Sequence, residues 1–131
     1  MVDSTRPGLS RTDLLLFAGL PLLKLLIHLL VGRGYGYFRD ELYYLACANH
    51  LAWGYVDHPP LSIALLAAWR ALFGDAVQSI RVVPALAGAA TVFITGLMAR
   101  RMGGGRFAQL LAMLAVIAVP MFLGLDCYYS M

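Results

Sequence analysis

Charged side chains are scarce in this chain of 131 residues. Only 13% of the residues are Asp, Glu, Lys or Arg, whereas soluble globular domains contain about 25%. Hydrophobic residues make up 61% of the chain. This composition excludes a water-soluble domain and a disordered chain, and it is typical of membrane proteins.

Cysteine is also rare, and no face of the chain is strongly basic. Cys47 and Cys127 are the two cysteines, and they show no spacing typical of metal ligands, so we predict no disulfide between them. Ten Lys and Arg against seven Asp and Glu give a net charge of +3. Because these charges cluster at the ends of apolar runs, nucleic acid is not the expected partner.

Three apolar runs approach the length of about 20 residues that a helix needs to cross a bilayer. They predict membrane spans over residues 14–31, 82–99 and 107–125. A fourth run, 61–73, would extend only about 20 Å as a helix. We expect it to be a juxtamembrane helix, together with a second one over 40–53. The predicted fold is all-α and integral to the membrane.

The sidedness of the spans follows from the basic residues. The short turn 100–106 contains three arginines between two spans, so the positive-inside rule places it in the cytoplasm with the N-terminus. The loop 32–81 then faces outward, into the periplasm or the extracellular space, from the plasma membrane. Five of the seven acidic residues also fall on this outer side, namely Asp40, Glu41, Asp57, Asp75 and Asp126.

Each conspicuous motif of the outer loop has a simple structural explanation. Asp40 and Glu41 suit the first turn of a helix, where acids cap free N–H groups and complement the helix dipole. Asp57 and His58 precede two prolines, which is a turn pattern. A metal site that also includes His50 is conceivable, but the spacing fits no standard zinc pattern.

Four features taken together carry more weight than any one of them. They are the pair Asp40-Glu41 after the first span, the stretch 57–61 (DHPPL), Arg81 with Pro84-Ala85, and Leu125-Asp126 after the third span. In this order they resemble the family of dolichyl-phosphate-mannose protein mannosyltransferases and aminoarabinose lipid A transferases, known as glycosyltransferase family 39. These are membrane glycosyltransferases of the GT-C fold that use polyprenyl-phosphate sugars.

The resemblance implies transfer of a sugar from a polyprenyl-phosphate donor to a hydroxyl or phosphate of a protein, lipid or glycan acceptor. The displacement would be single and inverting, with Asp40 as the general base. Glu41 would orient the acceptor or the loop, and Asp126 would polarise the acceptor or bind a metal. Arg81 and Arg39 would bind the donor phosphate.

The same resemblance gives the rest of the loop a supporting role. Tyr43 and Tyr44, with Asp57 and His58, would position the loop and the lipid-linked sugar at the level of the headgroups. No metal ligand set is predicted, and a divalent metal cofactor stays open. The sequence departs from the family in that Asp57 directly precedes His58 and in that the family's later spans and luminal domain are missing. Because of the missing spans and domain, we interpret residues 1–131 as the N-terminal part of a longer enzyme.

Two alternatives to the enzyme remain from the sequence. The first is a small non-enzymatic membrane protein that binds lipid or partner helices through the outer loop and the glycine-rich turn. The second is part of a transporter, suggested by Lys24 and His28 inside the first span. These two residues are four positions apart, so they share a helix face that must avoid lipid.

Overall fold

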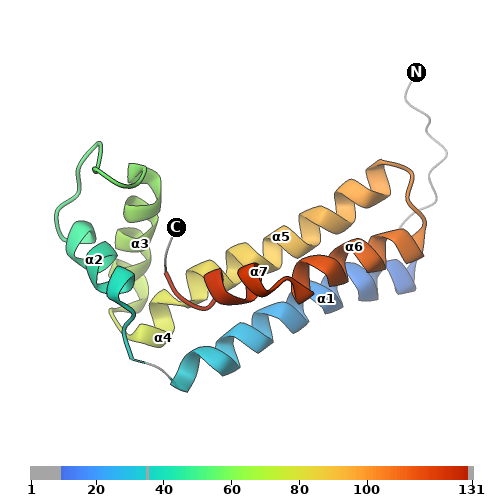
Figure 1. Ribbon diagram of the computed structural model, residues 1–131, viewed down its shortest axis with the longest axis horizontal. Coiled ribbons are helices and arrows are strands. Elements are labelled where there is room, and N and C mark those ends of the chain that lie inside the picture. Colours follow the sequence, from blue (N-terminus) through green and yellow to red (C-terminus); the bar gives the residue numbers. More distant parts are fainter. Residues whose placement is uncertain (1–9, 35, 130–131) are drawn as a thin grey trace.

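The computed structural model describes residues 10–34 and 36–129, and all regular elements in these ranges are helices. Three of them lie side by side in an elongated bundle (Figure 1). They are α1 (Arg11–Val31), α5 (Val82–Arg101) and α6 (Arg106–Ala118).

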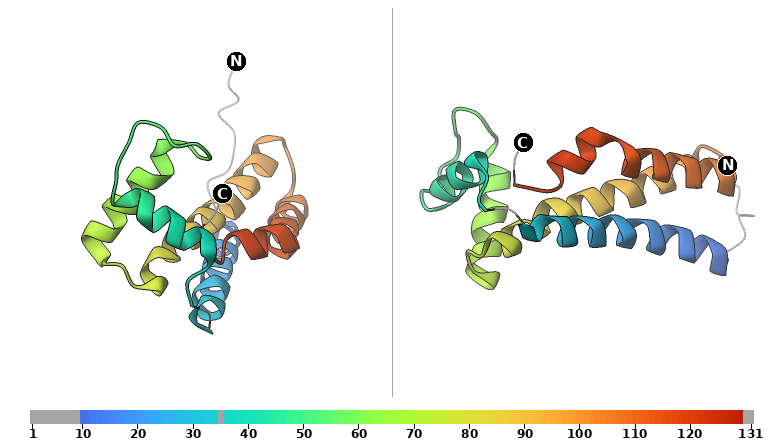
Figure 2. Two further views of the ribbon diagram at one scale, coloured as in Figure 1. Left: turned by 60° about the vertical axis from the view of Figure 1, so that its left-hand side comes forward. Right: turned by 60° about the horizontal axis from the view of Figure 1, so that its bottom comes forward.

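A smaller helical unit lies at one end of this bundle (Figure 2). It is formed by α2 (Arg39–Ala48), which packs against α3 (Pro60–Phe73). The short elements η1 (Gly32–Gly34), α4 (Val77–Ile80) and α7 (Pro120–Leu125) complete the described chain. The turn between α5 and α6 lies at the opposite end of the bundle from α2 and α3 (Figure 1).

Two helical stretches of the described chain are long and apolar enough to cross a membrane, Arg11–Gly34 and Val77–Arg101. They contain the first two predicted spans. Large apolar side chains on them remain exposed, among them Leu22, Leu30 and Phe93 at 53%, 65% and 40%. Lipid can cover such a surface, whereas water would penalise it. These helices therefore indicate that the protein is associated with a membrane.

The third predicted span, 107–125, is not a single helix in the structure. It is divided into α6 and α7, because Pro120 has no N–H to continue the hydrogen bonding and holds Val119 in an extended conformation, with φ −66° and ψ 119°. The 13 residues of α6 alone extend about 20 Å. A third membrane-spanning helix is thus not confirmed.

The helix α2 ends at Ala48, five residues before the end predicted for it. Tyr55 folds back over this end of the helix. Its hydroxyl accepts the N–H of Ala52 at 3.0 Å and lies 3.3 Å and 3.0 Å from the carbonyl oxygens of Cys47 and His50. The hydroxyl thus supplies a partner to a terminal carbonyl that would otherwise favour another helical turn.

Small residues on one stripe of α5 allow the three long helices to approach closely, as is common between membrane helices. The buried residues of this stripe are Ala85, Gly88, Ala89, Val92 and Gly96. A Cβ atom at Gly96 would lie only 2.6 Å from the sulfur of Met113 and 2.9 Å from the ring of Phe17. The bundle core at this level is formed by Phe17, Val92 and Met113.

A second core fixes α2 and α3 onto the bundle. It contains Tyr44, Ala48, Ile63, Leu66, Ile80 and Tyr129. These residues come from α2, α3, α4 and the segment after α7. The unit formed by α2 and α3 is therefore held by residues from both halves of the chain. This core lies directly beside the residues that the sequence singled out.

Candidate functional site

The centre of the site is an ion pair between Glu41 of α2 and Arg81 in the turn between α4 and α5. The Nε and Nη2 atoms of Arg81 donate to Oε1 and Oε2 of Glu41, both at 2.8 Å. Neither side chain is accessible, with 0% exposure for Glu41 and 6% for Arg81. Paired hydrogen bonds of this kind fix orientation as well as charge.

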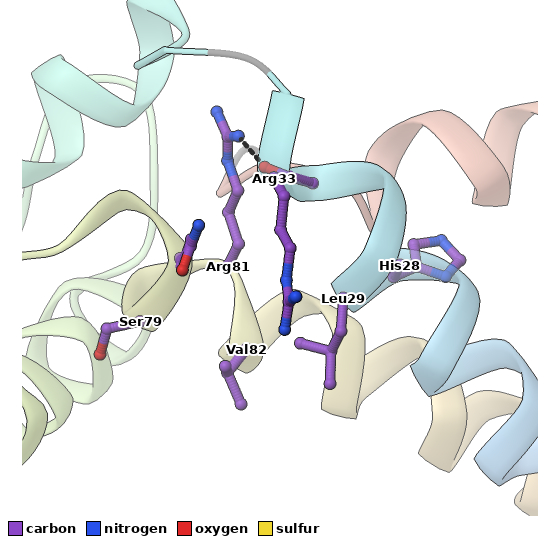
Figure 3. Close-up of a pocket in the computed structure, with 8 residues that line it drawn as sticks. His28, Leu29, Arg33, Ser79, Arg81 and Val82 are labelled. Carbon is purple, nitrogen blue, oxygen red and sulfur yellow. Dashed lines mark hydrogen bonds between the residues drawn. The ribbon is translucent and has the colours of Figure 1, made fainter.

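The remaining donors of Arg81 tie the same point to the end of α1. Nη1 donates to the carbonyl of Gly32 at 2.8 Å, as Figure 3 shows, and Nη2 also donates to the carbonyl of Gly36 at 2.7 Å. The guanidinium thus joins α1, α2 and α5. A side chain with these contacts holds the architecture of the site together.

Glu41 is kept ionised by its partners. Burial raises the pKa of its carboxyl group, but hydrogen bonds from Arg81 and from the backbone N–H groups of Phe38 and Tyr129 outweigh this effect. The net result is a pKa below the ordinary value. The bond from Phe38, at 2.8 Å, is also the reciprocal half of a capping box at the start of α2.

Asp40 occupies a different environment although it is the preceding residue. Its side chain is 39% exposed, and its Oδ1 atom lies 3.5 Å from Nε of Arg39, whose own side chain is 93% exposed. Successive residues of a helix point about 100° apart, which separates the two carboxylates. The predicted acidic pair is therefore one buried, paired carboxylate and one accessible carboxylate.

Tyrosine rings surround His58 at the start of α3. Tyr55 stacks on the imidazole at 4.9 Å, and the rings of Tyr44 and Tyr43 lie at 4.8 Å and 5.5 Å. The hydroxyl of Tyr43 donates to Asp57 at 3.4 Å. The structure thus brings together the four loop residues that the sequence predicted to act as a group.

Asp126 forms an ion pair of its own, separate from the pair of Glu41 and Arg81. Its Oδ2 atom is 2.6 Å from Nζ of Lys24, which comes from α1. Three residues later, the N–H of Tyr129 donates to Oε1 of Glu41 at 3.2 Å. Asp126 itself is therefore paired inside the bundle, and its segment reaches the central ion pair through the backbone.

Two cavities reach Arg81. One, of about 290 Å³, is lined by the end of α1, by α4 and by the turn between α4 and α5. In Figure 3, Arg33 extends along Leu29 and Val82. Arg81 points away from them, toward the carbonyl with which it forms a hydrogen bond. The other, of about 480 Å³, is lined in part by the rings of Tyr37, Phe38 and Tyr128. A charged group and an apolar chain would both find room at this end of the bundle.

Metal ligands do not gather in the part of the chain that the structure describes, where no group of three or more His, Cys, Asp or Glu side chains could hold an ion. In the set considered from the sequence, His58 is buried among rings while His50 and Asp57 are exposed. A metal bound by these three would require their rearrangement.

Sequence reasoning missed Arg33 and Tyr129 as contributors to the site, and it singled out Lys24 without giving it a role there. Arg33 has no motif around it, and Tyr129 acts through its backbone N–H, which has no signature in a sequence. Lys24 did carry a signal, since a lysine inside an apolar span rarely faces lipid. Its partner Asp126, more than 100 positions away, could not be inferred from spacing.

Comparison with known proteins gives one match. A family model described as dolichyl-phosphate-mannose-protein mannosyltransferase matches residues 57–126, which is 70 of the 131 residues. The match includes Asp57, His58, Arg81 and Asp126 and begins after the acidic pair. No curated protein and no solved structure matches the chain.

Proposed function

This chain belongs to the dolichyl-phosphate-mannose-protein mannosyltransferase family, and we propose that it acts in a membrane glycosyltransferase whose donor is a polyprenyl-phosphate sugar. The acceptor is a hydroxyl or phosphate of a protein, lipid or glycan. The site lies on the outward face of the plasma membrane, where a lipid-linked donor has access to it. Both cavities beside Arg81 lie at the end of the bundle that holds α2 and α3, which supports this location.

The observation that carries the proposal is the contrast between Asp40 and Glu41. A general base must reach its substrate, and Asp40 is accessible, whereas Glu41 is completely buried against Arg81. Neighbouring carboxylates in different environments commonly take different roles. We assign the base to Asp40 and the support of the helix that carries it to the Glu41–Arg81 pair.

In the proposed step, the Asp40 carboxylate takes the proton of the acceptor hydroxyl. The acceptor oxygen forms its bond to the anomeric carbon as the bond from that carbon to the donor phosphate breaks. The configuration inverts, and polyprenyl phosphate leaves with the electron pair. A positioned general base contributes about 10²- to 10⁴-fold to the rate of such a step.

Cations at the outer end of the bundle serve the departing phosphate. The phosphate contact predicted for Arg81 would require its bonds to Glu41, Gly32 and Gly36 to open, so we assign Arg81 to positioning. Arg39 and Arg33 are exposed, and Arg33 lines the smaller cavity. Their guanidinium groups can offer paired hydrogen bonds to phosphate oxygens.

The tyrosine-rich loop positions the donor and the base. Tyr43 and Tyr44 are anchored by Asp57 and His58, which holds the start of α3 against α2. Aromatic side chains with a polar tip suit the level of the lipid headgroups.

The test is an Asp40→Asn substitution in the full-length protein, which keeps the size of the side chain and removes its basicity. We expect transfer from a radiolabelled polyprenyl-phosphate sugar to fall by about 10²-fold or more. The control is Asp75→Asn, which removes the same charge from an exposed acid of the same loop, although it also breaks the ion pair of Asp75 with Arg70. Normal turnover by a correctly inserted Asp40→Asn protein would remove the mechanism.

A further inference from the structure

An ion pair lies inside the helix bundle, away from the proposed base. Nζ of Lys24 is 2.6 Å from Oδ2 of Asp126, with 0% and 15% exposure of the two side chains. The alignment of the two groups does not meet hydrogen-bond geometry, so the contact is one of charge. The ring of Phe122 also lies 5.6 Å from the ammonium nitrogen.

Both polar residues within the apolar part of α1, residues 14–31, thus face the bundle. His28, one turn after Lys24, is 3% exposed, and its Nδ1–H donates to the Lys24 carbonyl at 2.8 Å. A buried ion pair is rarely worth its desolvation cost to stability alone, because apolar residues of similar size serve as well. Ionisable residues within membrane helices usually mark a function.

The carboxylate of Asp126 rests on Gly88 of α5. A Cβ atom at Gly88 would overlap the Asp126 carboxylate and would lie 2.8 Å from Cε of Lys24. The absence of a side chain at this position therefore makes the space in which the two charges meet. Three helices, α1, α5 and α7, contribute to this seat through Lys24, Gly88 and Phe122.

From this seat the chain runs directly to the central ion pair of the site. The ring of Tyr128 stacks on Phe38, next to α2, at 4.6 Å. The N–H of Tyr129 donates to Glu41 at 3.2 Å, and its hydroxyl donates to the carbonyl of Ser62 at 2.6 Å. Segment 126–129 is therefore held at one end by Lys24 and at the other by α2 and α3.

We propose that Lys24 is a positioning residue of the transfer reaction: by seating Asp126 it fixes segment 126–129, whose Tyr129 N–H holds Glu41 beside the base. The inference rests on the proposed function for its effect on catalysis. In this inference Asp126 acts through its ion pair with Lys24 and not through contact with substrate. A displaced segment leaves Glu41 with one donor fewer and loosens the first turn of α2.

Cys127 provides a readout that does not depend on activity. The thiol is half-buried, and burial together with Asp126 raises its pKa, so a thiol reagent reacts slowly with it in the native protein. Lys24 lowers this pKa, and removing the lysine would by itself slow the reaction. Faster labelling in a Lys24 variant therefore reports a loosened segment.

The experiment measures maleimide labelling of Cys127 by mass spectrometry in the full-length protein, relative to the labelling of the same variant in denaturant. We expect Lys24→Met to raise the labelling rate about tenfold or more, because it leaves a buried carboxylate unpaired. Gly88→Ala should do the same without changing any charge. Gly19→Ala is the matched control, since a Cβ there meets no atom within 4 Å.

Activity of the same variants then identifies the role of the pair. Lys24→Met should lower kcat about tenfold or more, because Glu41 beside the base is displaced. The donor KM should rise as well, because Cys127 and Tyr128 of the displaced segment line the larger cavity. The double variant Lys24→Met/Asp126→Asn leaves no unpaired charge. It should return both labelling and kcat to within about threefold of the wild type.

Three outcomes overturn the proposal. Unchanged Cys127 labelling in both Lys24→Met and Gly88→Ala would show that the pair does not hold the segment. If the double variant showed native Cys127 labelling but a kcat as low as that of the single variant Asp126→Asn, Asp126 would be a catalytic residue. A double variant as loosely held as Lys24→Met would show that charge neutrality does not matter. Retained transfer by Asp40→Asn removes the proposed function instead and leaves the labelling result standing.

Discussion

Single residues of this site are distinguished by burial more than by type. Glu41 is held by donors from three residues and cannot reach a substrate, whereas Asp40 remains in solvent contact one position earlier. The family resemblance implied different roles for the two acids, with Asp40 as the base and Glu41 orienting the acceptor or the loop, but the sequence did not show their different burial. The division between them depends on Arg81, which lies 40 positions away and was expected to bind phosphate.

The lowered pKa of Glu41 makes a prediction about pH at the residue scale. A carboxyl group whose pKa is depressed in the folded state contributes stability above its unfolded pKa, near 4.5, and this contribution is lost as the pH falls through the lower folded value. We expect the thermal midpoint in detergent to fall on acidification below about pH 4.5. The dependence should weaken in Glu41→Gln and persist in Asp40→Asn.

The same substitution should be costly at neutral pH. Glu41→Gln leaves Arg81 as a buried charge without its counterion, which destabilises proteins by about 3 to 5 kcal/mol. Denaturant unfolding in detergent measures this difference. A loss of less than about 1 kcal/mol, as at exposed ion pairs, would contradict the burial of the pair.

At the scale of elements, the break between α6 and α7 directs the end of the chain toward the site. Val119 takes an extended conformation before Pro120, so α7 leaves the axis of α6, and Asp126 follows directly on α7. A continuous helix over 107–125 would change the direction of Asp126 relative to Lys24. Pro120, which interrupts the predicted span, therefore helps to direct Asp126 toward Lys24.

Pro120→Ala tests this role. Alanine restores the N–H and favours helix by about 3 kcal/mol over proline, so we expect α6 and α7 to join. The amide proton of Met121, which follows the proline, should then gain protection from hydrogen exchange, and labelling of Cys127 should accelerate. Joined helices with unchanged Cys127 labelling would show that the break does not place segment 126–129.

Much of the whole molecule could be predicted from hydropathy. The first two spans lie within the two long apolar helical stretches, and the stretch predicted over 61–73 forms α3. The end of α2 could not be predicted, because it is set by the hydroxyl of Tyr55 from the following loop. Pro120 is a sequence signal for the break in the third predicted span, but the prediction over 107–125 followed the apolar run alone.

The site could be predicted in its parts but not in its pairings. Motif order selected Asp40, Glu41, Arg81 and Asp126, and a family model independently covers the last two. The contacts that define their roles join residues 40 to more than 100 positions apart, and several run to backbone carbonyl or N–H groups. Such contacts depend on helix packing and leave no local pattern in a sequence.

The central claim is that the acidic pair and Arg81 lie on the outward face of the membrane, with the basic turn on the other. In a background of Cys47→Ser and Cys127→Ser, single cysteines replace Arg39, whose side chain is 93% exposed, and Met102, which is 85% exposed. We expect a membrane-impermeant maleimide to label position 39 in intact cells and position 102 only after permeabilisation. Labelling of position 102 but not of position 39 in intact cells would contradict the account.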